Sequence, residues 1–158
     1  MKPRVYLETT IVSYLVATGS PDLIQSAHQE ITRHWWERRA QFELYVSRTV
    51  VAEARRGHPE AAARRLAALR GIPRLAAGRQ VVALAETLIR NGTLPTQARV
   101  DGIHVGVAAV NGIEYLLTWN LRHLANAVIR GKIDEAVRKA GLVPPIICTP
   151  EELMEAKS

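Results

Sequence analysis

The sequence predicts an α/β protein, built as a three-layer α/β/α sandwich around a central, mainly parallel sheet. Short apolar segments alternate with helical segments along the chain, which favours parallel strands joined by right-handed helical crossovers. The length of 158 residues, with 47% hydrophobic and 23% charged residues, is ordinary for one globular domain with one core. We therefore expect residues 1–158 to form a single domain.

The first half of the chain predicts two strands, each followed by a polar turn and a helix. The apolar residues 5–7 end on Glu8 and two hydroxyls, so the first strand delivers a carboxylate to a strand-to-helix turn. Residues 42–46 alternate like a second strand, and Ser47 is a candidate N-cap for the helix that follows. The expected helices of this half span residues 11–15, 23–39, 49–56 and 60–69.

The second half predicts three more strands and a buried helix. Pro73 restricts residues 71–75 to an edge strand, because proline cannot donate to the ladder. Residues 98–111 are apolar nearly all round and include small residues, which indicates a closely packed, buried helix. Thr149 and Pro150 predict the start of a terminal helix. The remaining expected elements are helices at 79–90, 120–128 and 134–139 and strands at 115–118 and 146–148.

The chain is strongly basic, with a formal net charge of +6 and an isoelectric point near 10.0. Such a charge attracts polyanions or an acidic protein partner, although a solvated face on alanine- and arginine-rich helices is a simpler alternative. Many of the arginines fall in one quarter of the chain, as Arg55, Arg56, Arg64, Arg65, Arg70, Arg74 and Arg79. The charge therefore favours an anionic partner without identifying it.

No segment of the sequence predicts a membrane anchor or a secretory signal. No apolar run approaches the roughly 20 residues that span a bilayer, and Glu8 interrupts the short apolar stretch near the N-terminus. The single cysteine, Cys148, excludes an intramolecular disulfide and lies in an apolar segment that predicts a buried thiol. We therefore expect a cytoplasmic protein without membrane contact.

Four polar residues stand at predicted strand ends or on predicted helices: Glu8, Glu53, Asp101 and Asn120. Carboxylates are almost never fully buried unless they are paired or bind a metal, so Asp101 on its apolar helix needs a partner. The carboxyl ends of strands in an open α/β sheet are where ligands bind. Oxygen ligands from separate elements suit a hard cation such as Mg²⁺ or Mn²⁺. These residues therefore predict a divalent-cation site.

Each candidate also has a structural explanation. Glu8 could simply mark the end of a strand, and Glu53 could pair with Arg56 one turn later. Asp101 could stabilise the first turn of its helix without being buried, and Asn120 could be an ordinary N-cap. The order and placement of the four residues together favour the functional interpretation.

The four motifs resemble those of the PIN-domain family, a nuclease fold that includes the VapC-like toxins of bacterial toxin-antitoxin pairs. The family begins with a strand that ends in an acid followed by Thr or Ser, as at Glu8. Its second acid is a Glu early in a helix, as at Glu53, and its third opens a buried helix with a His three residues later, as at Asp101 and His104. A strand then leads to Thr, any residue and an acid, which corresponds to residues 118–120.

The resemblance implies a Mg²⁺- or Mn²⁺-dependent endoribonuclease that hydrolyses RNA phosphodiester bonds, as the toxin of a type II toxin-antitoxin pair. It also implies a homodimer that binds an acidic antitoxin protein. The implied site comprises the catalytic residues Glu8, Glu53, Asp101 and Asn120, of which Glu8, Asp101 and Glu53 bind the metal, the supporting residues Thr10, Thr118 and His104, and the RNA-binding residues Arg55, Arg99 and Trp119.

Two positions depart from the commonest pattern of the family. Glu8 stands where Asp is usual, so its longer side chain requires an adjusted metal site. Asn120 stands where a fourth acid is usual and offers an amide without charge. The alternative hypothesis is therefore a degenerate PIN domain that binds RNA or a protein partner without cleaving. A doubly wound nucleotide-binding protein is a third hypothesis, but no glycine-rich phosphate loop follows the first strand.

Overall fold

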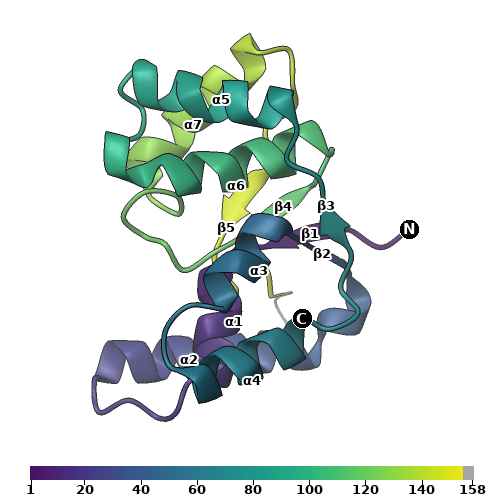
Figure 1. Cartoon of the computed structure of the whole chain (residues 1–158), viewed down its shortest axis with the longest axis vertical. Helices are drawn as coiled ribbons and strands as arrows, with labels where there is room; N and C mark the ends of the chain where they lie inside the picture. Colours follow the sequence, from purple (N-terminus) through teal and green to yellow (C-terminus); the bar gives the residue numbers. More distant parts are fainter. Residues whose placement is uncertain (155–158) are drawn as a thin grey trace.

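A five-stranded sheet runs through the middle of the computed structural model, which describes residues 1–154 (Figure 1). Every pairing between neighbouring strands is parallel, and the strand order is β3-β2-β1-β4-β5. The strands are β1 (Arg4–Leu7), β2 (Glu43–Ser47), β3 (Arg74–Leu75), β4 (Tyr115–Leu117) and β5 (Ile146–Cys148). The predicted parallel sheet is confirmed, with the strand predicted at 71–75 reduced to two residues.

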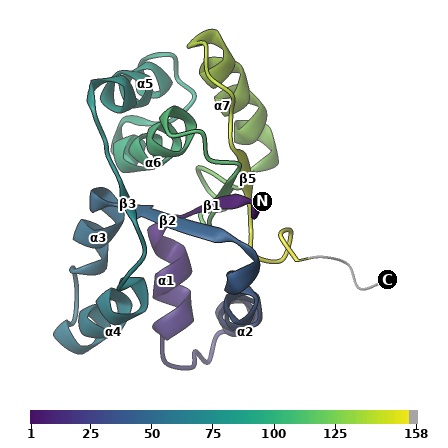
Figure 2. The ribbon, with the colours of Figure 1, turned by 90° about the vertical axis from the view of Figure 1, so that its right-hand side faces the viewer.

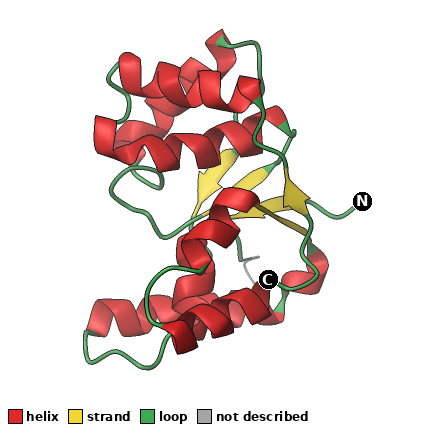
Figure 3. Cartoon of the chain, viewed as in Figure 1, coloured by secondary structure: helices red, strands yellow, loops and turns green. Residues whose placement is uncertain are grey.

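Helices cover both faces of this sheet. Figure 2 shows α1 to α4 on one face and α5 to α7 on the other, and the strands form a yellow layer between red helices in Figure 3. The helices are α1 (Thr9–Val16), α2 (Leu23–Glu37), α3 (Arg48–Ala54), α4 (Pro59–Leu69), α5 (Arg79–Arg90), α6 (Arg99–Val110) and α7 (Ala127–Lys139), with short 3₁₀ turns at Arg39–Gln41 and Thr96–Ala98. The three-layer α/β/α sandwich is therefore confirmed.

The order in which strands are added to the sheet reverses at β1, which lies at its centre. From β1 the chain proceeds outward through β2 and β3, and it then returns through α5 and α6 to place β4 on the other side of β1. The carboxyl ends of β1 and β4 therefore meet at the topological switch point, where a doubly wound sheet forms its ligand crevice. The backbone N–H of Glu8 donates to the carbonyl of Leu117 at 3.0 Å, which joins the two strand ends.

Helices α5 and α6 pack against each other at very short distance. Gly102 and Gly106 face α5, and a Cβ built on Gly106 would lie 2.9 Å from the carbonyl oxygen of Val81. Such an approach is closer than a side chain allows, so the glycines permit two helix backbones to pack directly. Almost all of α6 is buried, as its apolar sequence predicts. Its two polar residues near the sheet, Asp101 and His104, are therefore placed by a tightly packed helix.

The structure corrects the sequence-based prediction after β4. Residues 121–124 form turns instead of the predicted helix from Asn120 through Val128, and the helix predicted at 134–139 is the end of the longer α7. Asn126 caps α7, because its side chain accepts from the backbone N–H groups of Val128 and Ile129. The prediction missed this cap because residues 121–128 contain apolar residues at helical spacing on both sides of it.

A capped turn follows β5. Thr149 N–H donates to Glu152 Oε1 at 3.1 Å, and Glu152 N–H donates to Thr149 Oγ1 at 3.3 Å, which is a capping box. Residues 151–153 form a turn, and the rest of the predicted terminal helix lies outside the described residues.

Two further sequence expectations concern membrane contact and the thiol. Among residues 1–154, no helix combines the length and the apolar character needed to cross a bilayer. Cys148 is buried at the end of β5, and burial raises the pKa of its thiol to about 12. The predicted buried thiol is therefore confirmed.

Candidate metal centre

Glu8 is a buried carboxylate at the end of β1, with only 4% of its surface exposed. Its side chain curls back as the N-cap of α1 and accepts from Thr10 N–H at 3.1 Å. Two hydroxyls complete its contacts, since Thr10 Oγ1 and Thr118 Oγ1 donate to Glu8 Oε1 at 2.5 and 2.6 Å. Glu8 forms no ion pair with any residue in the described part of the chain. A buried, ionised carboxylate without an ion pair is unfavourable unless a positive charge binds near it.

Glu53 reaches the same place from α3. Its Oε1 atom accepts from Thr9 Oγ1 at 2.6 Å and lies 2.7 Å from His104 Nε2. Its Oε2 atom has no hydrogen-bond partner among residues 1–154 and is free to accept a ligand. Burial opposes the ionisation of Glu53, but the hydrogen bond and charge of His104, with help from Thr9 and Arg56, hold its pKa below the ordinary value.

His104 connects Glu53 to a buried chain of hydroxyls. Its Nδ1 atom lies 2.6 Å from the hydroxyl of Tyr6, which lies 2.8 Å from Oγ of Ser47. Burial disfavours the charged imidazole, yet the hydrogen bond to Glu53 and the charges of Glu8, Glu53 and Asp101 raise the pKa of His104. These hydrogen bonds fix the orientation of the His104 imidazole, and the imidazole in turn fixes the Glu53 carboxylate.

These side chains form a group with the spacing of metal ligands. One atom each from Glu8, Glu53 and His104 lies within 4.8 Å of the others. The Nε2 atom of His104 is already directed at Glu53, so the donors best placed for a cation are the two carboxylates. Oxygen donors of this kind suit Mg²⁺ or Mn²⁺, and a nearby imidazole is more compatible with Mn²⁺ than with Mg²⁺ as a direct ligand. The residues therefore fit a divalent cation.

Asp101 does not belong to this compact group, although the sequence predicts it as the third metal-binding carboxylate. Its Oδ1 atom accepts from Asn120 Nδ2 at 3.0 Å, and its Oδ2 atom lies 3.1 Å from His123 Nδ1. Asp101 lies one turn before His104 on α6, so the imidazole reaches the position next to Glu53. The compact group thus holds Glu8 and Glu53 of the predicted ligand set together with His104, and metal binding by Asp101 stays a prediction.

Asn120 supports Asp101 and the loop that follows β4. In addition to its bond to Asp101, its backbone N–H donates to Thr118 Oγ1 at 2.9 Å and its Oδ1 accepts from His123 N–H at 2.9 Å. The capping role considered from the sequence is thus present, but it caps a turn instead of an α-helix. All the polar groups of the Asn120 side chain are engaged within the protein, and its predicted catalytic role stays a prediction.

Of the predicted RNA-binding residues, Trp119 is buried, whereas Arg55 and Arg99 are exposed. Trp119 is 7% exposed, stacks on His28 with 4.0 Å between ring centroids, and donates its indole N–H to Thr32 Oγ1 at 2.7 Å. Burial and the stacked His28 leave little of the ring open to a base, and the RNA-binding role of Trp119 stays a prediction. Arg99 is exposed and lies 3.5 Å from Glu86, and Arg55 is exposed at the end of α3.

Sequence reasoning missed several residues that hold the centre together: Tyr6, Thr9, Ser47 and His123. A tyrosine inside an apolar strand is one signal that was available, because a buried phenol needs a hydrogen-bond partner. The position of His123 three residues after Asn120 is another, since that spacing places its N–H at a side-chain cap. The contact between Thr9 and Glu53 joins residues 44 positions apart, and no local pattern indicates it.

Compared with known protein families and with curated proteins, the chain matches none of them. The interpretation of the site therefore depends on its geometry and on the four sequence motifs.

Proposed function

We propose that this protein is an endoribonuclease that depends on a divalent cation, Mg²⁺ or Mn²⁺, held by Glu8 and Glu53. The observation that carries the proposal is the convergence of Glu8, Glu53 and His104 to within 4.8 Å at the switch point of the sheet. Glu8 is buried there and forms no ion pair among the described residues, and the one imidazole of the group, that of His104, is already hydrogen-bonded to Glu53, so a bound cation would supply charge that the two carboxylates lack.

Hydrogen bonds from the surrounding side chains hold the Glu8 and Glu53 carboxylates in place for cation binding. Thr10 and Thr118 fix Glu8, while Thr9 and His104 fix Glu53, so the two carboxylates cannot turn away from each other freely. When bound, the cation supplies a Lewis acid that activates a water molecule and offsets charge on a scissile phosphate. The net charge of +6 supports a polyanionic substrate such as RNA.

The resemblance to the PIN-domain family supports a more specific proposal. In it, the protein acts in the cytoplasm as the toxin of a type II toxin-antitoxin pair, forms a homodimer and is inhibited by an acidic antitoxin. A neighbouring reading frame that encodes a small acidic protein would support this assignment.

An RNA cleavage assay tests the proposed activity. The purified protein is incubated with end-labelled RNA in Mg²⁺ or Mn²⁺ and, separately, in a chelator. We expect cleavage only with the cation, and a loss of at least about a hundredfold in Glu8→Gln and Glu53→Gln, larger than the loss typical of outer partners. Glu37→Gln, on the exposed side of α2, is the matched control and should cut like the wild type.

The assay also separates the second candidate function. In a degenerate PIN domain the protein binds RNA or a protein without cutting, and the engagement of Asp101 by Asn120 and His123 favours this alternative. Absence of cleavage with either cation would support it. Cleavage that persists unchanged in Glu8→Gln and Glu53→Gln would refute the proposed centre, and Asp101→Asn shows whether that carboxylate takes part.

A further inference from the structure

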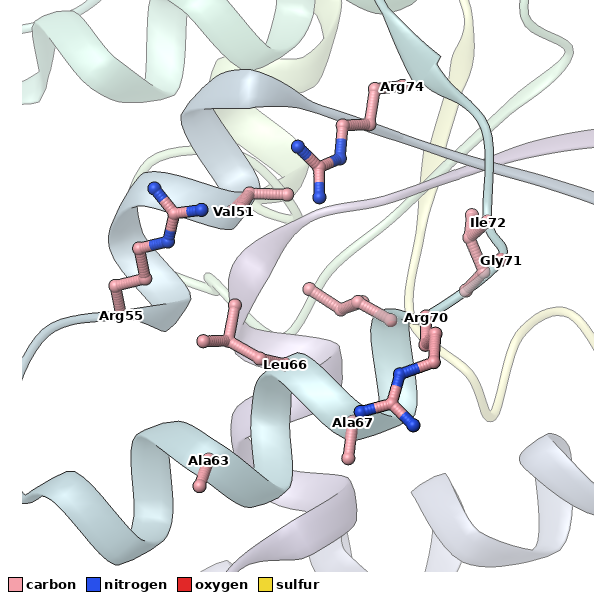
Figure 4. Close-up of a pocket in the computed structure, with 10 residues that line it drawn as sticks. Val51, Arg55, Ala63, Leu66, Ala67, Arg70, Gly71, Ile72 and Arg74 are labelled. Atoms are coloured by element: carbon pink, nitrogen blue, oxygen red, sulfur yellow. The ribbon is translucent and has the colours of Figure 1, made fainter.

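A cleft with an arginine rim lies between α3, α4 and β3, separate from the metal centre. Its volume is about 450 Å³, within the range of ligand pockets. Arg55 extends from the end of α3, Arg70 from the end of α4 and Arg74 from β3 (Figure 4). In the figure the guanidinium groups of Arg55 and Arg74 point toward each other across Val51.

The three guanidinium groups have no anionic partner among residues 1–154. None of them forms an ion pair or a side-chain hydrogen bond with any residue of the described chain, whereas Arg65 nearby donates to the carbonyls of Ala54 and Arg56. No acidic residue of the described chain lines the cleft. The like charges of Arg55 and Arg74, which point toward each other, repel, so a bound anion would relieve an unfavourable arrangement.

The floor of the cleft is apolar, which narrows the class of ligand. It consists of aliphatic side chains from α3 and α4, among them Val51, Leu66 and Ala67. A nucleotide combines a phosphate, which a guanidinium binds through two parallel hydrogen bonds, with a sugar and base that pack on apolar surface. An arginine rim over an aliphatic floor is complementary to that combination.

The position of the cleft relates it to the metal centre. Val51 and Arg55 are four residues apart and share one side of α3, whereas Glu53 between them faces Glu8 and His104. The cleft and the metal centre therefore lie on different sides of the same short helix, α3.

We infer that this cleft binds a nucleotide of the RNA strand on one side of the scissile bond, with Arg55 and Arg74 on its phosphate. The inference rests on the proposed function for its substrate class, RNA. Arg55 and Arg74 are exposed and have no structural partner in the described chain, so their substitution by glutamine should leave the fold intact. Arg70 contributes further positive charge at the edge of the cleft.

Binding is measured by fluorescence anisotropy with a short labelled single-stranded RNA, in a chelator so that the RNA stays intact. The double variant Arg55→Gln/Arg74→Gln should bind roughly tenfold more weakly for each guanidinium that is removed. The slope of the logarithm of affinity against the logarithm of salt concentration should fall by about two, since two phosphate-binding charges are absent.

The control variant is Lys132→Gln/Arg138→Gln, which removes the same charge from α7 on the opposite face of the sheet (Figure 2). It should keep the affinity and the salt slope of the wild type. Equal loss in both double variants would overturn the inference, because the effect would then come from net charge alone. Urea unfolding of each variant verifies that the fold is retained.

The outcomes for the cleft and for the metal centre are distinguishable. If the wild type binds RNA through the cleft but cuts none in Mg²⁺ or Mn²⁺, the inference stands and the proposed function fails. If the wild type cuts RNA and the cleft variant binds as tightly as the wild type, the inference is overturned and the proposed function stands. After the second result, an acidic protein would be the next occupant of the cleft to test.

Discussion

The Nε2 atom of His104 lies 2.7 Å from Oε1 of Glu53, although the two residues belong to helices on opposite faces of the sheet. The imidazole reaches the carboxylate past the end of β1, and its other nitrogen is fixed by the hydroxyl of Tyr6. The Glu53 carboxylate is thus oriented by a chain of buried groups that begins inside the sheet. Changes to these hydrogen-bonded groups should be detectable at the candidate metal centre without any substitution of a carboxylate.

Removal of the Tyr6 hydroxyl tests this coupling. Tyr6→Phe leaves Nδ1 of His104 and the hydroxyl of Ser47 without their buried partner, which should lower the free energy of unfolding by about 1–3 kcal/mol. The affinity for Mn²⁺ should fall by about tenfold to a hundredfold, as is typical when an outer hydrogen bond is removed. Calorimetric titration and urea unfolding measure the two effects. Tyr45→Phe is the control, because among the described residues that hydroxyl donates only to Glu43, at 3.3 Å on the exposed surface.

The stability of the metal-free protein should depend on pH through His104 and Glu53. The pKa of His104 is raised from 6.5, so its contribution is complete below pH 6.5 and is lost as the pH rises through the raised pKa. The pKa of Glu53 is lowered from 4.5, so its contribution is complete above pH 4.5 and is lost as the pH falls through the lowered pKa. The pair therefore stabilises the fold most between these two values.

Urea unfolding in a chelator, repeated across the pH range, measures this dependence. Above pH 6.5 the stability should decline in the wild type, and the decline should be smaller in His104→Gln. His34→Gln changes an exposed histidine on α2 and should follow the wild-type curve. A wild-type stability that increases with pH above 6.5 would contradict the assigned direction.

The glycines of α6 provide a prediction about the fold itself. Gly106→Ala places a methyl group against the backbone of Val81, so α5 and α6 must separate, at a cost of about 1–3 kcal/mol. The matched control is Gly131→Ala on α7, where no atom lies within 4 Å of the new methyl and alanine should stabilise the helix by about 0.5–1 kcal/mol. Opposite signs in urea unfolding would support the close packing, whereas equal effects would argue against it.

The sequence predicted the sheet and its helices well because periodicity and capping are local. Ser47 caps α3 as expected, with Val50 N–H 3.2 Å from its hydroxyl, and the small residues of α6 correspond to its close packing. The sequence could not show that His104 is the residue of α6 beside Glu53, because Asp101 and His104 lie one turn apart on the same helix. Which of them faces Glu53 depends on how α6 rotates against α5, and that rotation is a property of the packed structure.

The covered position of Trp119 predicts the effect of a substitution there. Trp119→Phe removes the indole N–H that Thr32 accepts, so stability should fall by about 1–3 kcal/mol. The affinity for single-stranded RNA should stay at the wild-type value, because His28 already occupies the face of the ring. Anisotropy and urea unfolding measure the two quantities. A large loss of RNA affinity in the folded variant would support the stacking role expected from the sequence.

The amide of Asn120 determines whether a second carboxylate meets Asp101. In Asn120→Asp the N–H donor to Asp101 is replaced by an oxygen, so two carboxylates face each other where a 3.0 Å hydrogen bond existed. In a chelator this should destabilise the fold by about 0.5–1.5 kcal/mol, the net value of the lost hydrogen bond between two half-buried side chains. Mn²⁺ should then stabilise the variant more than the wild type, by about 1.4 kcal/mol for each tenfold gain in affinity at saturating cation.

Asn126→Asp is the control for this experiment, because Asn126 caps α7 and aspartate is an equally good N-cap. Its stability should change little and should show no additional response to Mn²⁺. Thermal unfolding of both variants, with and without the cation, gives the comparison. If Asn120→Asp responds to Mn²⁺ no more than the wild type does, Asp101 and residue 120 lie too far from the cation to share it. Glu8 and Glu53 would then be the only carboxylates that the centre uses among the described residues.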